Sequence, residues 1–148
     1  MRPHQWQLDI LDYIKNYNDD RKILWYWEST GNIGKSVFAK HLVMKQNTIV
    51  VSNVRDMKRA ITQRLPNGSY RIGRLKKGIK TKICILDVHR SIKRINWTEL
   101  EKIKDGCFYS RNSTVTTNRP ILICFANREP DIDLLSRDKW EIVEIQND

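Results

Sequence analysis

A short segment with two glycines, residues 29–36, holds the side chains with the clearest chemical potential. It reads Ser-Thr-Gly-Asn-Ile-Gly-Lys-Ser, which approximates the pattern G-x-x-x-x-G-K-[ST] with Ser29 at the first position. Such a loop turns tightly and directs backbone N–H groups at phosphate oxygens. Gly31 and Asn32 are residue types that tolerate a positive φ, and Gly34 lets the backbone approach a ligand closely. The segment therefore predicts a phosphate-binding loop.

The loop ends in a lysine and a serine that suit a nucleoside triphosphate. We expect Lys35 to bridge the β- and γ-phosphates as a point charge and the Ser36 hydroxyl to bind Mg²⁺. The apolar run Ile23–Trp27 predicts a strand before the loop, and a helix beginning at Lys35 would point its positive dipole end at the phosphates. The expected cofactors are ATP and Mg²⁺. The residues expected to bind the nucleotide are Ser29, Thr30, Gly31, Asn32, Ile33, Gly34, Lys35 and Ser36.

Polar side chains follow two more apolar runs, at points where predicted strands end. Asp87 follows four apolar residues, and a carboxylate at such a strand end can hold Mg²⁺ through water or Ser36. Asn127 follows the run Ile121–Ala126. An amide beside the γ-phosphate can orient water or sense hydrolysis, and a turn-forming asparagine is the alternative. The expected catalytic residues are Lys35, Asp87 and Asn127, and the expected metal ligands are Ser36 and Asp87.

The residue that activates the attacking water is not evident from the sequence. Many ATPases place a glutamate directly after the metal-binding aspartate, but Val88, His89 and Arg90 follow Asp87 here. Glu28, just before the loop, could serve as the base, or it could equally be a solvated loop residue. Both alternatives stay open at this point.

Helical and strand patterns alternate along the chain, and the strand runs are apolar on both faces. This pattern is typical of an α/β fold with a mainly parallel sheet covered by helices. Strands are expected at 23–27, 48–51, 81–86, 121–125 and 140–145. Helices are expected at 3–16, 35–44, 54–65 and 97–103, and an exposed hairpin at 108–118. We expect a single domain over residues 1–148, with a helical lead-in at 1–20 and the catalytic core at 21–148.

Charge is distributed unevenly in this basic chain of 148 residues, whose formal net charge is +10. Residues 57–86 include nine lysines and arginines and no acid, whereas residues 128–148 include seven acids and three bases. This segregation predicts one strongly positive face and a polyanionic partner. No apolar run approaches the roughly 18 residues that span a bilayer, and the first residues lack the apolar core of a signal peptide. We therefore expect a soluble intracellular protein without a membrane partner, in either the nucleus or the cytoplasm.

Four stretches occur in an order and spacing that one protein family shares. They are Arg-Pro-His-Gln-Trp-Gln at 2–7, Trp-Glu-Ser-Thr-Gly-Asn-Ile-Gly-Lys-Ser at 27–36, Ile-Leu-Asp-Val-His-Arg-Ser at 85–91 and Ile-Cys-Phe-Ala-Asn-Arg-Glu-Pro-Asp at 123–131. They resemble the domain start, Walker A, Walker B and motif C of superfamily 3 helicases fused to replication-associated (Rep) proteins. Those proteins initiate rolling-circle replication in circular single-stranded DNA viruses such as circoviruses and nanoviruses, in their satellites and in related plasmids.

This resemblance implies a P-loop ATPase with an AAA+-like core that hydrolyses ATP to move along single-stranded DNA. It also implies a homo-oligomeric ring, usually a hexamer, and a DNA-contacting hairpin between Walker B and motif C. Here that hairpin is expected near 106–118, with Ser110 and Arg111 at the position of a Ser-x-Lys element. Arg111 keeps the positive charge of the family's lysine but changes its geometry.

The chain departs from the family pattern in two places. The nuclease that usually precedes the helicase is not found, and the sequence leaves open an excised domain or a gene that lacks it. The family also implies an arginine finger that reaches the neighbouring subunit's nucleotide, for which Arg137 is the nearest candidate. The spacing in some relatives would instead put Lys139 at that position.

A basic stretch around 64–82 has an aromatic residue, Tyr70, among its cations. We expect this stretch, and Lys76 and Lys77 in particular, to contact nucleic-acid phosphates. A solvated loop without a partner is the alternative.

The function expected from these observations is that of an ATP-dependent DNA helicase. Two rivals stay open: a small P-loop phosphotransferase, and a nucleotide- or DNA-binding remnant that no longer hydrolyses ATP.

Overall fold

A parallel sheet of five strands forms the centre of the computed structural model, which describes residues 2–31, 34–64, 70–71 and 82–146. The strands are β1 (Ile23–Trp27), β2 (Thr48–Val51), β5 (Ile83–Asp87), β8 (Ile121–Ala126) and β9 (Trp140–Glu144). Their order is β2-β5-β8-β1-β9, and every neighbouring pair is parallel. The expected α/β class and parallel sheet are confirmed. Because β8 lies between β1 and β5, all three strands end side by side at one edge.

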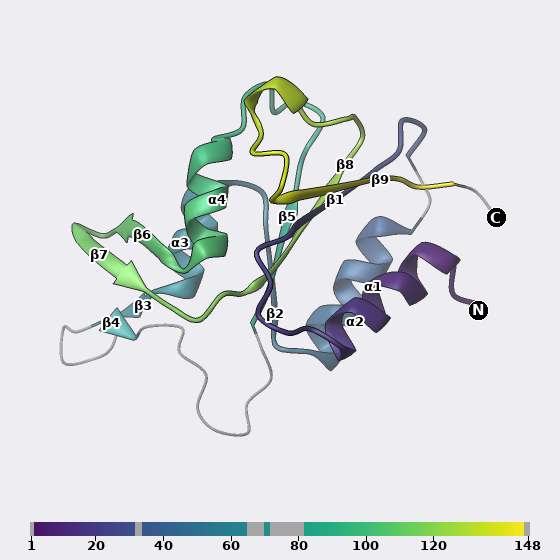
Figure 1. Cartoon of the computed structure of the whole chain (residues 1–148). Helices are drawn as coiled ribbons and strands as arrows, with labels where there is room; N and C mark the ends of the chain where they lie inside the picture. The colour runs from purple at the N-terminus through teal and green to yellow at the C-terminus, as the bar shows by residue number, and fades with distance from the viewer. Residues whose placement is uncertain (1, 32–33, 65–69, 72–81, 147–148) are drawn as a thin grey trace.

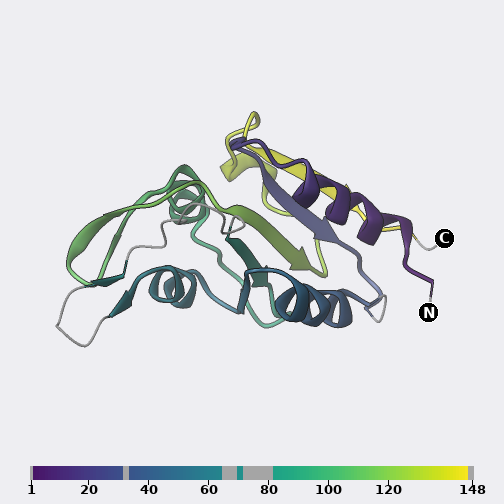
Figure 2. The same cartoon turned by 90° about the horizontal axis from the view of Figure 1, so that it is seen from below.

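Helices cover both faces of this sheet (Figure 1 and Figure 2). α1 (Gln5–Lys15) and α2 (Lys35–Lys45) lie on one face, while α3 (Val54–Ile61) and α4 (Trp97–Asp105) lie on the other. Successive residues of a strand point to opposite faces. In β5, Ile85 therefore joins the apolar cluster under α1 and α2, and Cys84 joins the cluster under α3 and α4. This division explains why the strands are apolar on both sides.

A two-stranded hairpin extends from the end of α4, far from both chain termini in the two views (Figure 1 and Figure 2). It consists of β6 (Cys107–Ser110) and β7 (Ser113–Thr116), so the expected hairpin is confirmed. Arg111 and Asn112 form its turn with φ values of 54° and 65°, as a two-residue turn of type I′ requires. The turn therefore holds Arg111 at the exposed tip.

The predicted helix at 54–65 is wrong at its C-terminal end. α3 stops at Ile61, and Thr62 is extended with its hydroxyl donating to the Lys58 carbonyl at 2.8 Å. The backbone then forms β3 (Gln63–Arg64), which pairs antiparallel with β4 (Tyr70–Arg71). Thr62 is buried within 3.5 Å of Ser110 Oγ, so packing against the hairpin ends the helix. A short 3-10 helix, η1 (Ile132–Leu134), was not expected.

The remaining boundaries differ from the predictions by two residues at most. The chief differences are at the two ends of α1, where helix begins at Gln5 and ends at Lys15, at the end of α4, and at the start of β5. In the described part of the chain, every helix is too short to cross a bilayer.

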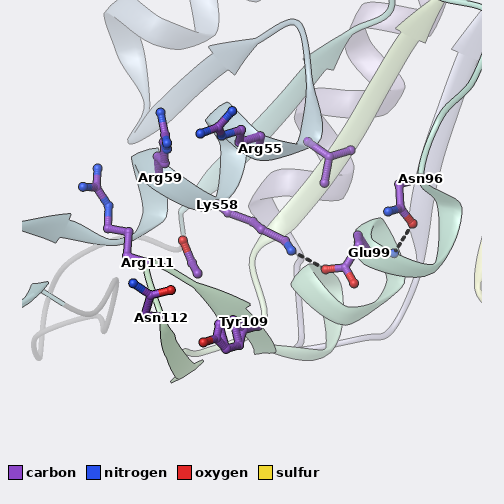
Figure 3. A pocket seen from close by; sticks show the side chains of 10 residues that line it. Arg55, Lys58, Arg59, Asn96, Glu99, Tyr109, Arg111 and Asn112 are labelled. Atoms are coloured by element: carbon purple, nitrogen blue, oxygen red, sulfur yellow. Dashed lines mark hydrogen bonds and ion pairs between the residues drawn. The ribbon is translucent and has the colours of Figure 1, made fainter.

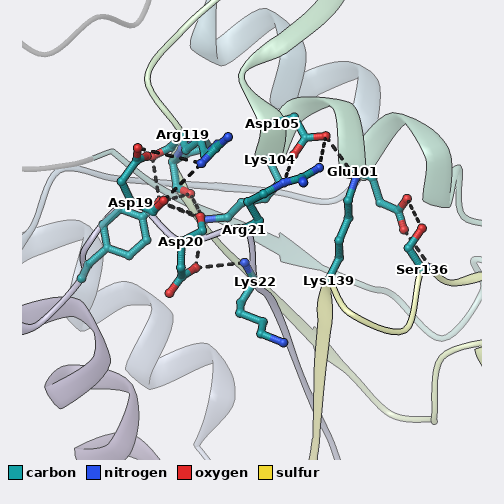
Figure 4. A network of polar contacts seen from close by, with 12 residues as sticks. Asp19, Asp20, Arg21, Lys22, Glu101, Lys104, Asp105, Arg119, Ser136 and Lys139 are labelled. Carbon is teal, nitrogen blue, oxygen red and sulfur yellow. Dashed lines mark hydrogen bonds and ion pairs between the residues drawn. The ribbon is translucent and has the colours of Figure 1, made fainter.

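A polar network ties the connection before β1 and the segment before β9 to α4 (Figure 4). Arg21 and Lys139 both bind the Asp105 carboxylate, at 3.2 and 3.1 Å. Lys104 is fully buried and donates to the Pro120 carbonyl, and this burial lowers the pKa of its ammonium group to about 8. The network therefore holds three segments that are distant in sequence in one arrangement.

Candidate functional site

A cavity of about 330 Å³ lies at the carboxyl edge of the sheet, where β1, β8 and β5 end. The strand register aligns Trp27 with Ala126 and Asp87 with Phe125, so the segments that follow these strands start close together. Six of the residues singled out in the sequence line the cavity: Gly31, Gly34, Lys35, Ser36, Asp87 and Asn127.

The phosphate loop leads from β1 into α2. Gly34 adopts the left-handed conformation with φ 88°, which glycine reaches without strain, and α2 begins at the next residue. The N-cap residue, Gly34, has no side chain with which to cap the helix, and residues 34–37 line the cavity, so the positive dipole end of α2 lies at this cavity. Ser29 and Thr30 are exposed at the start of the loop, while Asn32 and Ile33 lie outside the described residues.

Lys35 sits between the loop and the tip of β8. Its ammonium group donates to Glu28 Oε1 and the Ala126 carbonyl, both at 2.9 Å, and to Asn127 Oδ1 at 3.3 Å. Only 13% of the Lys35 side chain is exposed. These contacts bring Lys35 and Asn127 together.

Glu28 is a buried carboxylate, with 5% of its surface exposed. Its Oε2 accepts bonds from the Thr30 and Gly31 amides, both at 2.8 Å, and from the Thr30 hydroxyl at 2.6 Å. Burial alone would raise the pKa of Glu28, but bonds from Thr30, Lys35 and Gly31 outweigh it and lower the pKa to about 2. The alternative of a solvated loop residue is therefore wrong. The contacts of Glu28 with Thr30, Gly31 and Lys35 hold the loop in shape.

Asp87 is the last residue of β5, exposed at the cavity that Ser36 also lines. A hydroxyl and a carboxylate are the hard oxygen donors that Mg²⁺ prefers, and phosphates and water usually complete its coordination. Among the described residues no cluster of three or more His, Cys, Asp or Glu side chains could hold a metal ion by itself. Ser36 and Asp87 could supply two oxygen ligands to a metal ion.

Two further residues that line the cavity, His89 and Arg90, were not predicted to be site residues. A β-carbon added at Gly31 would lie 3.1 Å from Arg90 Nη2, so this guanidinium group lies over the phosphate loop. His89 Nδ1 accepts from the Ser91 amide at 3.1 Å. Arg90 could have been predicted from the sequence, because it follows the strand-end carboxylate Asp87 by three residues, at the carboxyl ends of the strands where phosphate is expected to bind.

The remaining predicted site residues lie away from this cavity. Arg137 is exposed and lines a separate hollow of about 270 Å³ beside β9. Lys139 binds Asp105, which leaves Arg137 as the better candidate for a residue that reaches another subunit. Ser110 is buried below the hairpin tip that carries Arg111, and Lys76 and Lys77 lie outside the described residues.

Comparison with known proteins gives relatives of one kind, although no protein-family model matches the sequence. The chain is 29% identical over 150 residues to Para-Rep C10 of Milk vetch dwarf C10 alphasatellite, covering 97% of this chain and 48% of the relative. It is 26% identical over 151 residues to Para-Rep C6 of Subterranean clover stunt C6 alphasatellite, with 97% and 47% covered. It therefore spans about half the length of these curated relatives. Over most of its length the chain is homologous to the Rep proteins of alphasatellites.

Proposed function

We propose that this chain is the ATP-hydrolysing helicase domain of a rolling-circle replication initiator, a P-loop ATPase with an AAA+-like core that moves on single-stranded DNA. The convergence of Lys35, Ser36, Asp87 and Asn127 on one cavity carries the proposal. The homology to alphasatellite Rep proteins supports the link to replication. We further propose that residues 1–148 form one domain.

The side chains around the cavity then have separate tasks. The N-terminal amides of α2 and the Lys35 ammonium group bind the ATP phosphates, for which Lys35 exchanges its contact with Glu28. Ser36 and Asp87 hold Mg²⁺, which when bound neutralises charge that develops on the phosphates. Asn127 already contacts Lys35 and lies where it can respond to the γ-phosphate.

We also propose that the domain assembles into a homo-oligomeric ring, with six subunits as the resemblance implies. Arg137 is exposed and outside its own subunit's nucleotide cavity, which suits a residue that completes a neighbour's site. Single-stranded DNA is the proposed polymer, with Ser110, Arg111, Lys76 and Lys77 as its proposed contacts.

The decisive experiment measures the rate of ATP hydrolysis against protein concentration, with and without single-stranded DNA, for the wild type and Lys35→Ala. We expect a rate that rises steeply with concentration and is stimulated by DNA. Lys35→Ala should lower it on the order of a hundredfold or more, because the charge that binds the phosphates is lost. A rate per subunit that depends neither on DNA nor on protein concentration would instead indicate a small phosphotransferase.

Two observations favour a second candidate, a domain that binds nucleotide without hydrolysing it. Lys35 is engaged by an ionised Glu28, and no carboxylate follows Asp87 to activate water. In that case the wild type binds a fluorescent ATP analogue, Lys35→Ala does not, and neither hydrolyses ATP at high protein concentration with DNA present.

A further inference from the structure

A second hollow, of about 600 Å³, lies between α3, the start of α4 and the hairpin (Figure 3). We name it the α3–hairpin groove. It is separate from the phosphate cavity, and the two share no lining residue in the described part of the chain. Its polar lining residues with long side chains come from α3 (Arg55, Lys58 and Arg59), α4 (Glu99) and the hairpin (Tyr109 and Arg111).

The groove carries an excess of positive charge, with four cations and one carboxylate among its lining residues. The carboxylate, Glu99, forms an ion pair with Lys58, and the hydrogen bond from Lys58 lowers its pKa. Arg55 and Arg59 are both exposed, four residues apart on one face of α3, and neither pairs with a carboxylate of a described residue. Arg111, from the turn of the hairpin, lines the same hollow (Figure 3). The groove therefore attracts an anion with several negative charges.

Tyr109 adds an exposed aromatic ring to this basic surface. The residues of β6 alternate, so Phe108 and Ser110 are buried whereas Tyr109 points outward with 56% of its surface exposed. The exposed ring lines the same hollow as the three arginines. An aromatic face beside guanidinium groups is the arrangement on which nucleic-acid bases stack while their phosphates are neutralised.

We propose that the α3–hairpin groove binds single-stranded nucleic acid, with Arg55 and Arg59 on backbone phosphates and Tyr109 against a base. This inference rests on the proposed function for its partner, DNA. It deepens that function, because it adds contacts with the DNA from the side of the hairpin and from α3 to the contact already proposed at Arg111.

The first test reverses the charge of the α3 arginines in the whole chain. Binding of a fluorescent oligo-dT of about 20 nucleotides is measured against salt for Arg55→Glu/Arg59→Glu. We expect at least about tenfold weaker binding at low salt, and a plot of log K against log salt that flattens by about 1.4, because two phosphate contacts are lost. Lys40→Glu/Lys45→Glu on exposed positions of α2 makes the same charge change and should alter binding less than about twofold. Equal losses in both double variants, or no loss in the first, would overturn the proposal.

The second test separates stacking from charge at Tyr109. Tyr109→Ala should weaken oligo-dT binding roughly 5- to 150-fold, while Tyr109→Phe, which keeps the ring, should bind nearly as the wild type does. An oligomer of the same length without bases should bind the wild type and Tyr109→Ala equally. A loss of the same size with the base-free oligomer contradicts stacking. Polyglutamate that competes as well as oligo-dT contradicts nucleic acid as the partner.

Two readouts separate this inference from the proposed function. The groove variants should keep the wild-type urea midpoint and the rate of ATP hydrolysis without DNA, and lose only oligo-dT binding and DNA stimulation. If Lys35→Ala hydrolyses ATP as fast as the wild type, the proposed function is contradicted. The groove proposal is still tested in that case, because oligo-dT binding by the groove variants is measured without ATP hydrolysis.

Discussion

At the phosphate cavity, the role of a single residue, Glu28, depends on how deeply the fold buries it. Glu28 stands directly before the loop, where it could have been an active base or a solvated residue. The fold instead buries it and surrounds it with donors from the loop and from Lys35. A buried carboxylate of this kind stabilises the loop only while it is ionised and hydrogen-bonded.

This role predicts a pH-dependent loss of stability in Glu28→Gln. The folded state lowers the pKa of Glu28 from 4.5 to about 2, so its contribution is present above pH 4.5 and is lost as the pH falls towards 2. Glu28→Gln should therefore lower the free energy of unfolding by about 2–3 kcal/mol at pH 7, and by much less at pH 3. Urea unfolding at both pH values measures this difference. Glu129→Gln, at an exposed position, should change stability by less than about 0.5 kcal/mol, and a Glu28→Gln deficit independent of pH would contradict the assignment.

Among the elements, the junction between α4 and the hairpin depends on one glycine. Gly106 ends α4 with φ 77°, and its carbonyl accepts a bond from the Thr117 amide at 2.8 Å. This closes the base of the hairpin and fixes the direction in which β6 leaves the helix. The same hairpin ends α3 early, through Thr62 and Ser110. The position of the α3–hairpin groove therefore depends on the junction between α4 and β6 and on the contact between Thr62 and Ser110, and not on the helix propensity of α3.

Gly106→Ala should destabilise the protein by about 2 kcal/mol or more. A β-carbon there would overlap the Thr117 carbonyl oxygen, in a conformation that non-glycine residues rarely adopt. Thermal or urea unfolding measures the loss. Asn112→Gly at the hairpin turn is the matched control, because its φ of 65° suits glycine and stability should stay equal or rise by a few tenths of a kcal/mol. If both substitutions had the same effect, the conformational requirement at Gly106 would be refuted.

At the scale of the whole molecule, the sheet order separates the cavity at Lys35 from a second exposed surface, beside β9. β9 is an edge strand, and the segment before it exposes Ile132 and Leu134, which are 60% and 61% accessible. Arg137 lies in the same segment, beside the hollow that β9 lines. Exposed apolar side chains next to an exposed arginine suit a subunit contact.

If Arg137 completes a neighbour's site, Arg137→Ala should lower ATP hydrolysis by roughly a thousandfold while nucleotide binding is retained. Mixing Arg137→Ala with Lys35→Ala should then restore part of the rate, because one subunit supplies the phosphate loop and the other the arginine. Lys139→Ala offers a comparison: its side chain binds Asp105, so stability rather than turnover should fall. Mixtures that remain inactive would show that Arg137 does not act between subunits.

Much of the fold and of the candidate site could be predicted because it depends on neighbours in the chain. Two-sided apolar strands indicated a covered parallel sheet, and the types and spacing of residues 29–36 indicated the phosphate loop. The hairpin at 107–116 was visible as a polar stretch rich in serine, threonine and asparagine.

Other features depend on contacts between distant segments, which local patterns do not encode. The strand order brings Lys35, Asp87 and Asn127 to one cavity, and it also lays Arg90 over Gly31. Glu28 holds the loop because the fold buries it among hydrogen-bond donors, and α3 ends where Thr62 packs against Ser110 of the hairpin. These outcomes were left to the tertiary structure because burial and side-chain pairing arise only when the elements pack, and packing overrides local propensity.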